Sequence, residues 1–161
     1  MFERYSILSR QAIMVARVEA GKLGSDSIDS EHLLMGIVCV HPDLLKSLGM
    51  EVGFDSLREH CREFRSPSSP IPNSRDLPVS EDGRRILQRA SAIADERRSQ
   101  EVRTEHFLLA MIEEPCHGAQ LLATHGSMRE KLLAVVTNVE SAPPQMETPA
   151  SREALKVALL D

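Results

Sequence analysis

The chain has few of the residues on which several protein classes depend. None of its 161 residues is Trp, only one is Tyr, and aromatic side chains make up 3% of the composition. The three cysteines, Cys39, Cys61 and Cys116, form no C-x-x-C pair, which argues against a disulfide scaffold. The core must therefore rest on Leu, Ile, Val, Ala and Met, and such a core favours packed helices over strands.

Other absences concern membranes, nucleic acids and nucleotides. The longest apolar run, residues 33–40, is far shorter than the ~20 residues that span a bilayer, and no secretory hydrophobic segment follows the first residues. We therefore expect a cytoplasmic protein with no membrane partner. The formal net charge of −5 argues against a nucleic-acid partner, which would require a basic face. No G-x-x-x-x-G-K-[ST] phosphate loop is present, so these residues cannot run an ATP cycle.

The strongest positive feature is an internal repeat. When residues 6–38 are aligned with residues 80–112, at an offset of 74, eight positions are identical. Unrelated sequences would give roughly two identities over this length. The identities include a Glu-His pair in each copy, and matches at offsets of 75 and 77 continue the repeat beyond these segments. The sequence therefore predicts a tandem duplication.

The repeat and the prolines together predict the domain organisation. One double-repeat domain should span residues 1–140, with repeats at 1–64 and 80–140. Between them, residues 65–79 contain four prolines and are expected to form an extended linker. Residues 141–161 contain three more prolines and are expected to form a flexible tail. Whether the end of this tail forms a further helix is left open.

Each repeat shows the pattern of four helices. Ser6 and Ser80 are expected to cap the first helix of each repeat, and Ser30 and Thr104 the second. A short third helix should end at Gly49, and a fourth carries apolar residues at i, i+4 and i+7. No segment alternates as a strand does. The predicted fold is all-α, a tandem pseudo-two-fold repeat of two four-helix units.

These features resemble a known family. The opening Met-Phe-Glu-Arg-Tyr-Ser, the doubled Ser/Thr-Glu-His-Leu/Phe-Leu segment and the 74-residue repeat are similar to the Clp N-terminal (Clp repeat) domain over residues 1–140. The resemblance implies a non-catalytic interaction module whose partners are Clp ATPase or protease subunits, adaptor proteins or substrate polypeptides. The alternative is the N-terminal substrate-recognition domain of a larger ATP-dependent Clp unfoldase.

The resemblance also implies a ligand site. In some ClpC-type domains a Glu pair contacts the guanidinium of phosphorylated arginine, and the matching residues here are Glu31 and Glu105. Ser6 and Ser80 match the family's Thr, whose hydroxyl stands at the helix start that receives the phosphate. We expect Tyr5 and Ser6 to form the first site together with Glu31.

Two observations weigh against this transfer. Glu31 and Glu105 are also ordinary first-turn acids, each worth about 0.3–1 kcal/mol with the helix dipole. At the second site Glu81 follows Ser80, and its charge would repel a phosphate. Phosphoarginine recognition is therefore only one alternative for these residues.

The remaining candidates favour structural roles. His32 and His106 are expected to make local hydrogen bonds at the start of their helices, since no oriented base or nucleophile accompanies them. Cys61 is expected in the core and Cys116 in an exposed loop, and neither belongs to a set of four metal ligands. We predict no catalytic residue, no metal and no cofactor.

Overall fold

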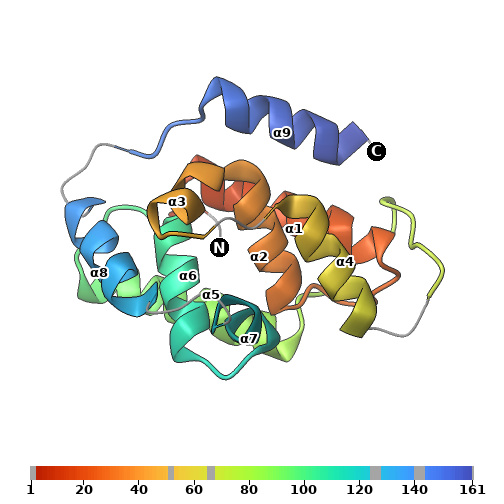
Figure 1. The fold of residues 1–161 in the computed structure, drawn as a ribbon, viewed down its shortest axis with the longest axis horizontal. Coiled ribbons are helices and arrows are strands. Elements are labelled where there is room, and N and C mark those ends of the chain that lie inside the picture. The colour runs from red at the N-terminus through yellow and green to blue at the C-terminus, as the bar shows by residue number, and fades with distance from the viewer. Residues whose placement is uncertain (1–2, 51–52, 65–67, 124–127, 140–143, 161) are drawn as a thin grey trace.

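The computed structural model is helical throughout its regular elements. It describes residues 3–50, 53–64, 68–123, 128–139 and 144–160. Within these ranges no strand forms, and none of the helices is long and apolar enough to cross a membrane. The helices are α1 (Ile7–Lys22), α2 (Ser30–Val40), α3 (Pro42–Ser47), α4 (Phe54–Phe64), α5 (Glu81–Glu96), α6 (Thr104–Glu113), α7 (His117–Ala123), α8 (Met128–Val139) and α9 (Pro149–Leu160) (Figure 1).

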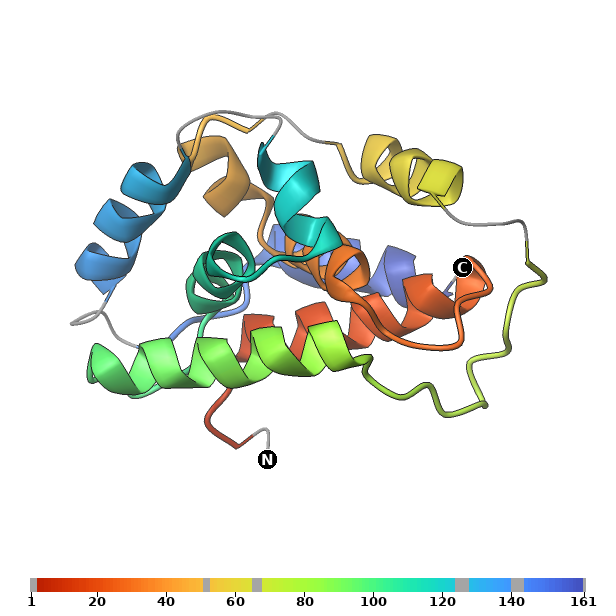
Figure 2. The same ribbon diagram turned by 90° about the horizontal axis from the view of Figure 1, so that it is seen from below.

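The predicted pair of four-helix units is confirmed. Helices α1 to α4 form the first repeat, and α5 to α8 form the second. Both views place α2 and α6 in the middle of the molecule and α4 and α8 toward opposite ends (Figures 1 and 2). The central helices carry the largest buried side chains, among them Leu33, Leu34, Phe107 and Leu108. The middle of the double repeat is therefore a mainly aliphatic core.

The two repeats are joined by two short backbone pairings, which we call the backbone exchange. The residues before α1 pair with those before α6, and the residues before α5 pair with those before α2. Tyr5 of the first pairing corresponds to Val79 of the second at the offset of 74, and Val102 corresponds to Ile28 at the same offset, so the two pairings are equivalent. The bonds run from Ser6 N to Val102 O (3.0 Å), Val102 N to Arg4 O (2.9 Å), Ser80 N to Ile28 O (3.0 Å) and Ile28 N to Pro78 O (2.9 Å).

The first helix of each repeat starts as predicted. Ser6 Oγ accepts a hydrogen bond from Ser9 N at 3.1 Å, and Ser80 Oγ accepts one from Gly83 N at 3.0 Å. These bonds satisfy amides that the first helical turn leaves without a partner. Both predicted N-caps are therefore confirmed.

The second helix of each repeat starts one residue earlier than predicted. Asp29 and Arg103 occupy the N-cap positions, and Ser30 and Thr104 are the first helical residues. The cap is made in another way, because the backbone amides of Asp29 and Arg103 donate to the side chains of His32 and His106, each at 2.9 Å. The hydroxyls of Ser30 and Thr104 are thereby directed to other partners.

Small residues allow α1 and α2 to cross closely. A Cβ atom on Gly36 would lie 2.0 Å from the backbone oxygen of Ala12, which no side chain tolerates. Ala16 and Ala20 on the same helix as Ala12 are fully buried. The first repeat is therefore held together by a backbone contact that only glycine permits.

The described part of the linker, residues 68–79, contains no helix, as expected of its prolines. It runs along the first repeat, where Ile71 N donates to Gly21 O at 2.8 Å and the Arg17 guanidinium donates to the carbonyls of Asn73 and Arg75. Residues 65–67 of the predicted linker lie outside the described residues.

The C-terminal segment differs from the expected flexible tail. Residues 149–160 form α9, which packs on α1 and α2 along one side of the molecule (Figure 1, blue). The start of α9 is capped reciprocally, because Ser151 N donates to Thr148 Oγ1 and Thr148 N donates to Ser151 Oγ. Pro149 occupies the first helical position, where proline is favourable. These start signals outweigh the helix-breaking tendency of the prolines before them.

Candidate functional site

The two glutamates singled out by the sequence lie in equivalent buried places. Glu31 is in the first turn of α2 and Glu105 in the first turn of α6, and each is 3% exposed. A surface acid that only stabilises a helix dipole would remain solvated. Burial therefore indicates that these carboxylates are built into the structure around them.

Each carboxylate faces a histidine of the other repeat. His117 Nδ1 lies 3.6 Å from Glu31 Oε2, and the negative charge of Glu105 acts on His41. Both histidines stand where the short third helix of a repeat begins. The sequence offset between them is 76, close to the 74 that relates the glutamates.

The hydroxyls that follow the N-caps complete these contacts. Ser30 Oγ accepts a hydrogen bond from Gly118 N at 2.9 Å, and Thr104 Oγ1 lies 2.8 Å from His41 Nδ1. Burial lowers the pKa of His41 below its ordinary value, and the nearby Glu105 and Asp43 carboxylates oppose this only in part. His41 is therefore a neutral hydrogen-bonding group near pH 7.

We call the hollow beside Glu31 the Glu31 pocket. Its volume is about 780 Å³, and Asp82 from the first turn of α5 places a second carboxylate on its wall. The rest of the lining is apolar or weakly polar. The lining residues are Glu31, Asp82, Pro115, Cys116, His117, Ala119, Gln120 and Ala123.

The equivalent hollow beside Glu105 is the Glu105 pocket. It measures about 350 Å³, and its lining includes Pro144, Gln145, Met146, Thr148 and Ala150. Leu8 stands where the Glu31 pocket has Asp82, since the two positions are 74 residues apart. The side chains from the two repeats that line it are Leu8, Val40, His41, Pro42, Asp43, Arg103 and Glu105.

The expected grouping of Ser6 with Glu31 is wrong. The backbone exchange brings Ser6 to Val102 and the start of α6, and therefore beside the Glu105 pocket. Ser80 is brought in the same way to Ile28, ahead of the helix that carries Glu31. Each site is therefore made by both repeats, because the serine comes from one repeat and the glutamate from the other. We call this arrangement crosswise.

Tyr5 faces neither carboxylate pocket. Its ring meets Phe107 edge to face, with centroids 5.5 Å apart, and burial raises the pKa of its hydroxyl. It lines a separate hollow on α5 together with Leu87 and Ser91. In this structure Tyr5 therefore joins the two repeats.

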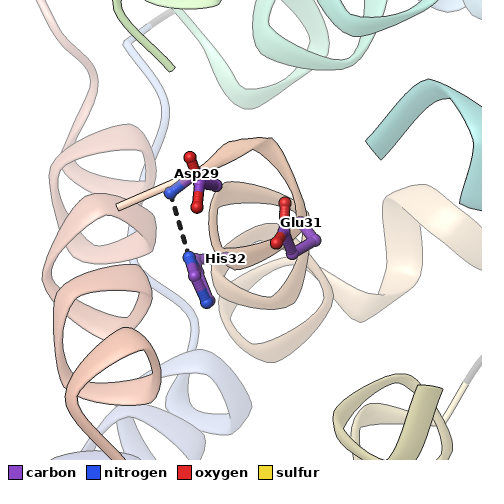
Figure 3. A group of neighbouring side chains, drawn as sticks. All are labelled: Asp29, Glu31 and His32. Carbon is purple, nitrogen blue, oxygen red and sulfur yellow. Dashed lines mark hydrogen bonds between the residues drawn. The ribbon is translucent and has the colours of Figure 1, made fainter. Parts of the chain in front are cut away.

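Asp29, Glu31 and His32 form the group of possible metal ligands closest in space within the described ranges, with one ligand atom of each inside 4.8 Å. Figure 3 shows the His32 ring turned back to the Asp29 amide, which donates to Nδ1 at 2.9 Å. The Nδ1 atom of His32 is therefore already used in a hydrogen bond at the start of α2. The local hydrogen bond expected for His32 is thus confirmed. Asp29 and His32 cap the start of α2.

The cysteines are buried and joined by no disulfide. Cys61 lies in the core, as predicted. The expectation of an exposed Cys116 is wrong, because its thiol lies under α7 and accepts a hydrogen bond from Ala119 N at 3.3 Å. Burial raises the pKa of Cys116 and raises that of Cys39 to about 11. Neither thiol is poised as a nucleophile.

The sequence reasoning missed four residues of the pockets: His41, His117, Asp82 and Gln145. The two histidines carried a usable signal, since each begins the third helix of its repeat once the offset is allowed to slip from 74 to 76. Asp82 and Gln145 carried none, because only tertiary packing brings them to the glutamates.

Comparison with known proteins identifies the family to which this chain belongs. The model of the Clp repeat (R) N-terminal domain matches residues 4–125. The chain belongs to this family. A Clp repeat N-terminal domain is a non-catalytic, all-helical module, which agrees with the absence of an ATP-binding loop from this sequence.

Curated relatives are much longer than this chain. The chloroplastic chaperone ClpD of Arabidopsis thaliana is 23% identical over 153 residues, which are 87% of this chain and 16% of ClpD. The chaperone ClpB of Pseudomonas putida is 26% identical over 162 residues, 96% of this chain and 19% of ClpB. The chain therefore spans less than a fifth of the length of these relatives.

Solved structures confirm the fold. The crystal structure of the Arabidopsis thaliana ClpD N-terminal domain matches with a TM-score of 0.72 at 23% identity, covering 84% of this chain and 99% of that one. The Hsp104 N-terminal domain of Candida albicans matches with a TM-score of 0.69 at 17% identity, covering 92% and 99%. The helical double repeat is thus the fold of Clp-type N-terminal domains.

Proposed function

We propose that this Clp repeat domain is a non-catalytic protein-interaction module of the Clp unfoldase and proteolysis system. It docks substrate polypeptides, adaptors or Clp subunits. The observation that carries the proposal is the Glu31 pocket, an open hollow between the repeats that holds a buried carboxylate of one repeat and a histidine of the other. Among the described residues no nucleophile is aligned with a base there, so the pocket binds and does not react.

The lining of the Glu31 pocket favours a cationic side chain. Glu31 supplies a buried carboxylate, and a guanidinium forms paired, charge-assisted hydrogen bonds with such a group. Asp82, to which Arg85 already donates, adds a second carboxylate to the wall. Pro115 and Ala119 supply apolar surface for the methylene stem of the same side chain. An arginine on an extended peptide satisfies both features.

Phosphoarginine is the second candidate ligand. The buried carboxylate of Glu31 suits its guanidinium. Asp82 would repel its phosphate, and the Ser80 hydroxyl expected to receive that phosphate already caps α5. Unmodified arginine is therefore the better fit, and the two ligands can be separated by one titration series.

Calorimetry with one arginine peptide, prepared with and without phosphorylation of the guanidinium, tests the assignment. We expect the unmodified peptide to bind the wild type and to bind Glu31→Gln at least tenfold more weakly. Glu81→Gln is the matched control, because Glu81 is an exposed neighbour of Asp82. Asp82→Asn should improve binding of the phosphorylated form. Equal affinity of the wild type and Glu31→Gln for both peptides would exclude the Glu31 pocket as the binding site.

The partners of the chain distinguish two roles that it could have in the Clp system. A stand-alone module and the substrate-recognition domain of a larger unfoldase would both present the Glu31 pocket. Co-purification of the tagged chain with purified Clp ATPase and protease subunits tests the first possibility, and a phosphate-binding loop downstream in the natural reading frame would establish the second. We propose a cytoplasmic or similarly reducing compartment, since three cysteines form no disulfide; fractionation tests this.

A further inference from the structure

The two equivalent pockets differ in what covers them. The Glu31 pocket is open, whereas Gln145 and its neighbours form part of the wall of the Glu105 pocket. The Gln145 side chain accepts a hydrogen bond from Ser6 Oγ and donates to Thr104 Oγ1 at 3.4 Å. Its backbone amide donates to the Glu101 carboxylate at 2.9 Å. A peptide segment is thus already seated at the start of α1 and α6.

The same segment continues into α9 along α1 and α2. Ala158 is 5% exposed, and its carbonyl accepts a hydrogen bond from Lys22 Nζ at 3.2 Å. The thiol of Cys39 donates to the carbonyl of Ala154 at 3.7 Å. Gln11 Nε2 donates to Glu147 Oε1 at 2.8 Å, between the pocket and the helix. The pocket and the helix face together hold residues 144–160 in a continuous path.

Only the first repeat is suited to such a segment. Its contact residues Leu8, Lys22 and Cys39 correspond, at the offset of 74, to Asp82, Glu96 and Glu113 in the second repeat. Two of those acids are engaged by one arginine on the protein surface, since Arg89 bonds Glu113 at 2.7 Å and Glu96 at 2.9 Å. The charged face of the second repeat would be costly to cover with an apolar helix.

The segment is held by a small apolar contact. Ala154, Leu155 and Ala158 pack against the core, while Val157 is 55% exposed and Leu160 85%. A 12-residue helix has little stability of its own in water. Exchange of α9 for another helix of similar pattern therefore breaks a small apolar contact and the hydrogen bonds from Lys22 and Cys39.

We propose that the Glu105 pocket and the adjoining face of α1 and α2 form a peptide-binding site whose ligand is residues 144–160 of the chain itself. The segment closes this site to other polypeptides and leaves the Glu31 pocket open. A competing ligand must match its chemistry, which is an extended polar stretch followed by a helix with a small apolar face. This inference rests on the proposed function, because it concerns regulation of one of two equivalent docking sites.

Thiol labelling in the full chain tests whether α9 is docked. Cys39 lies beneath α9, so Ala158→Arg should undock the helix and increase the rate of Cys39 alkylation at least tenfold. Val157→Arg, on the exposed face of the same helix, is the matched control and should leave the rate unchanged. Peptide mapping by mass spectrometry reads Cys61 and Cys116 in the same sample, and their continued protection shows that the fold is intact. Equal Cys39 rates in the two variants would overturn the docking.

A peptide added in trans tests whether the vacated site binds the segment. A fluorescent peptide of residues 144–160 should bind the Ala158→Arg variant at least tenfold more tightly than the wild type or Val157→Arg, because in those chains the attached segment competes at high effective concentration. The same peptide carrying Ala158→Arg should not bind. Equal binding to wild type and variant, or no binding to a variant whose Cys39 is exposed, would overturn the inference. Either result leaves arginine-peptide binding at the Glu31 pocket to be judged separately.

Discussion

A buried ion pair in the first repeat provides the sharpest test of how the fold is held together. Glu19 of α1 is fully buried, and Arg58 of α4 reaches it with two hydrogen bonds, from Nε to Oε2 and from Nη2 to Oε1, both 2.9 Å long. Lys22 Nζ lies 3.4 Å from the same carboxylate. The arrangement ties the outer helix α4 to α1.

Removing the arginine alone should be strongly destabilising. Arg58→Ala leaves a buried carboxylate without its main partner, a change that costs about 3–5 kcal/mol in buried pairs. Lys22 still neutralises part of the Glu19 charge, which favours about 3 kcal/mol, at the lower end of that range. The contact of the guanidinium with the Phe54 ring, 4.9 Å from its centroid, is lost as well.

Urea unfolding followed by circular dichroism measures this loss. With a denaturant dependence of about 2 kcal/mol per molar urea, the midpoint should fall by roughly 1.5 M in Arg58→Ala. Arg62→Ala is the control on the same helix, since Arg62 pairs with Glu59 at 2.7 Å while both side chains are more than half exposed. That substitution should cost less than about 1 kcal/mol.

The second repeat supplies a rescue variant. Ile93 and Leu133 occupy the positions that correspond to Glu19 and Arg58, at offsets of 74 and 75. The double variant Glu19→Ile/Arg58→Leu removes both charges and should lie within about 1 kcal/mol of the wild type, because an apolar pair replaces a buried ion pair without leaving a charge behind. Equal losses in Arg58→Ala and Arg62→Ala, or a double variant as unstable as Arg58→Ala, would refute the reasoning.

Three further predictions concern backbone and histidine positions. Gly36→Ala should lower the free energy of unfolding by about 3 kcal/mol or more, because its Cβ meets the α1 backbone, whereas Gly53→Ala, whose Cβ has no neighbour nearer than 3.8 Å, should change it by less than about 1 kcal/mol; urea midpoints compare them. Arg98→Gly should raise the free energy of unfolding by about 1 kcal/mol, and the urea midpoint with it, because Arg98 has a φ of 55° and glycine adopts this region without strain. His41 has its folded-state pKa lowered below 6.5, so the unfolded chain binds more protons and stability should fall as the pH decreases from 6.5 through that lowered pKa. His41→Asn should reduce this pH dependence of the urea midpoint, and wild-type behaviour in His41→Asn would contradict the assignment.

Much of the fold could be predicted because the duplication repeats its local signals. Ser6 and Ser80 cap equivalent helices, and Gly24, with a φ of 71°, takes the left-handed position that Arg98 takes in the second repeat. Buried apolar residues recur at the same spacing in both copies. Each helix start and each core stripe is therefore specified by neighbours a few residues away, which sequence patterns report well.

The crosswise grouping of the site could not be predicted in this way. An internal repeat shows that Ser6 is equivalent to Ser80 and Glu31 to Glu105, but it is silent on which serine meets which glutamate. That choice depends on the backbone exchange between the repeats, whose bonds join residues about 50 or more than 90 positions apart. The local sequence is the same for either grouping, so only the tertiary structure distinguishes them.

The sequence left the C-terminal helix open for a different reason. Prolines at 143, 144 and 149 argue against a helix, yet Pro149 falls at the first helical position, where its missing amide costs no intrahelical hydrogen bond. Thr148 and Ser151 cap the helix reciprocally. The stability of α9 then comes from its contact with α1 and α2. The weak local preference for a helix is therefore realised because α1 and α2 provide a face on which α9 packs.

A duplicated domain begins with two equal pockets, and side-chain changes alone decide whether they remain equal. Here Leu8 and Asp82 stand at equivalent positions, so the Glu105 pocket has an apolar side chain where the Glu31 pocket has a carboxylate. The further carboxylate of the Glu105 pocket, Asp43, is accompanied in the lining by Arg103. The apolar wall suits a segment that carries few charges, and the attached residues 144–148 are the nearest such segment at high local concentration. The Asp82 carboxylate repels a segment that carries an acid, as residues 144–148 do at Glu147, and attracts a cation. The same substitution that closes one site to outside ligands therefore directs them, by charge, to the other.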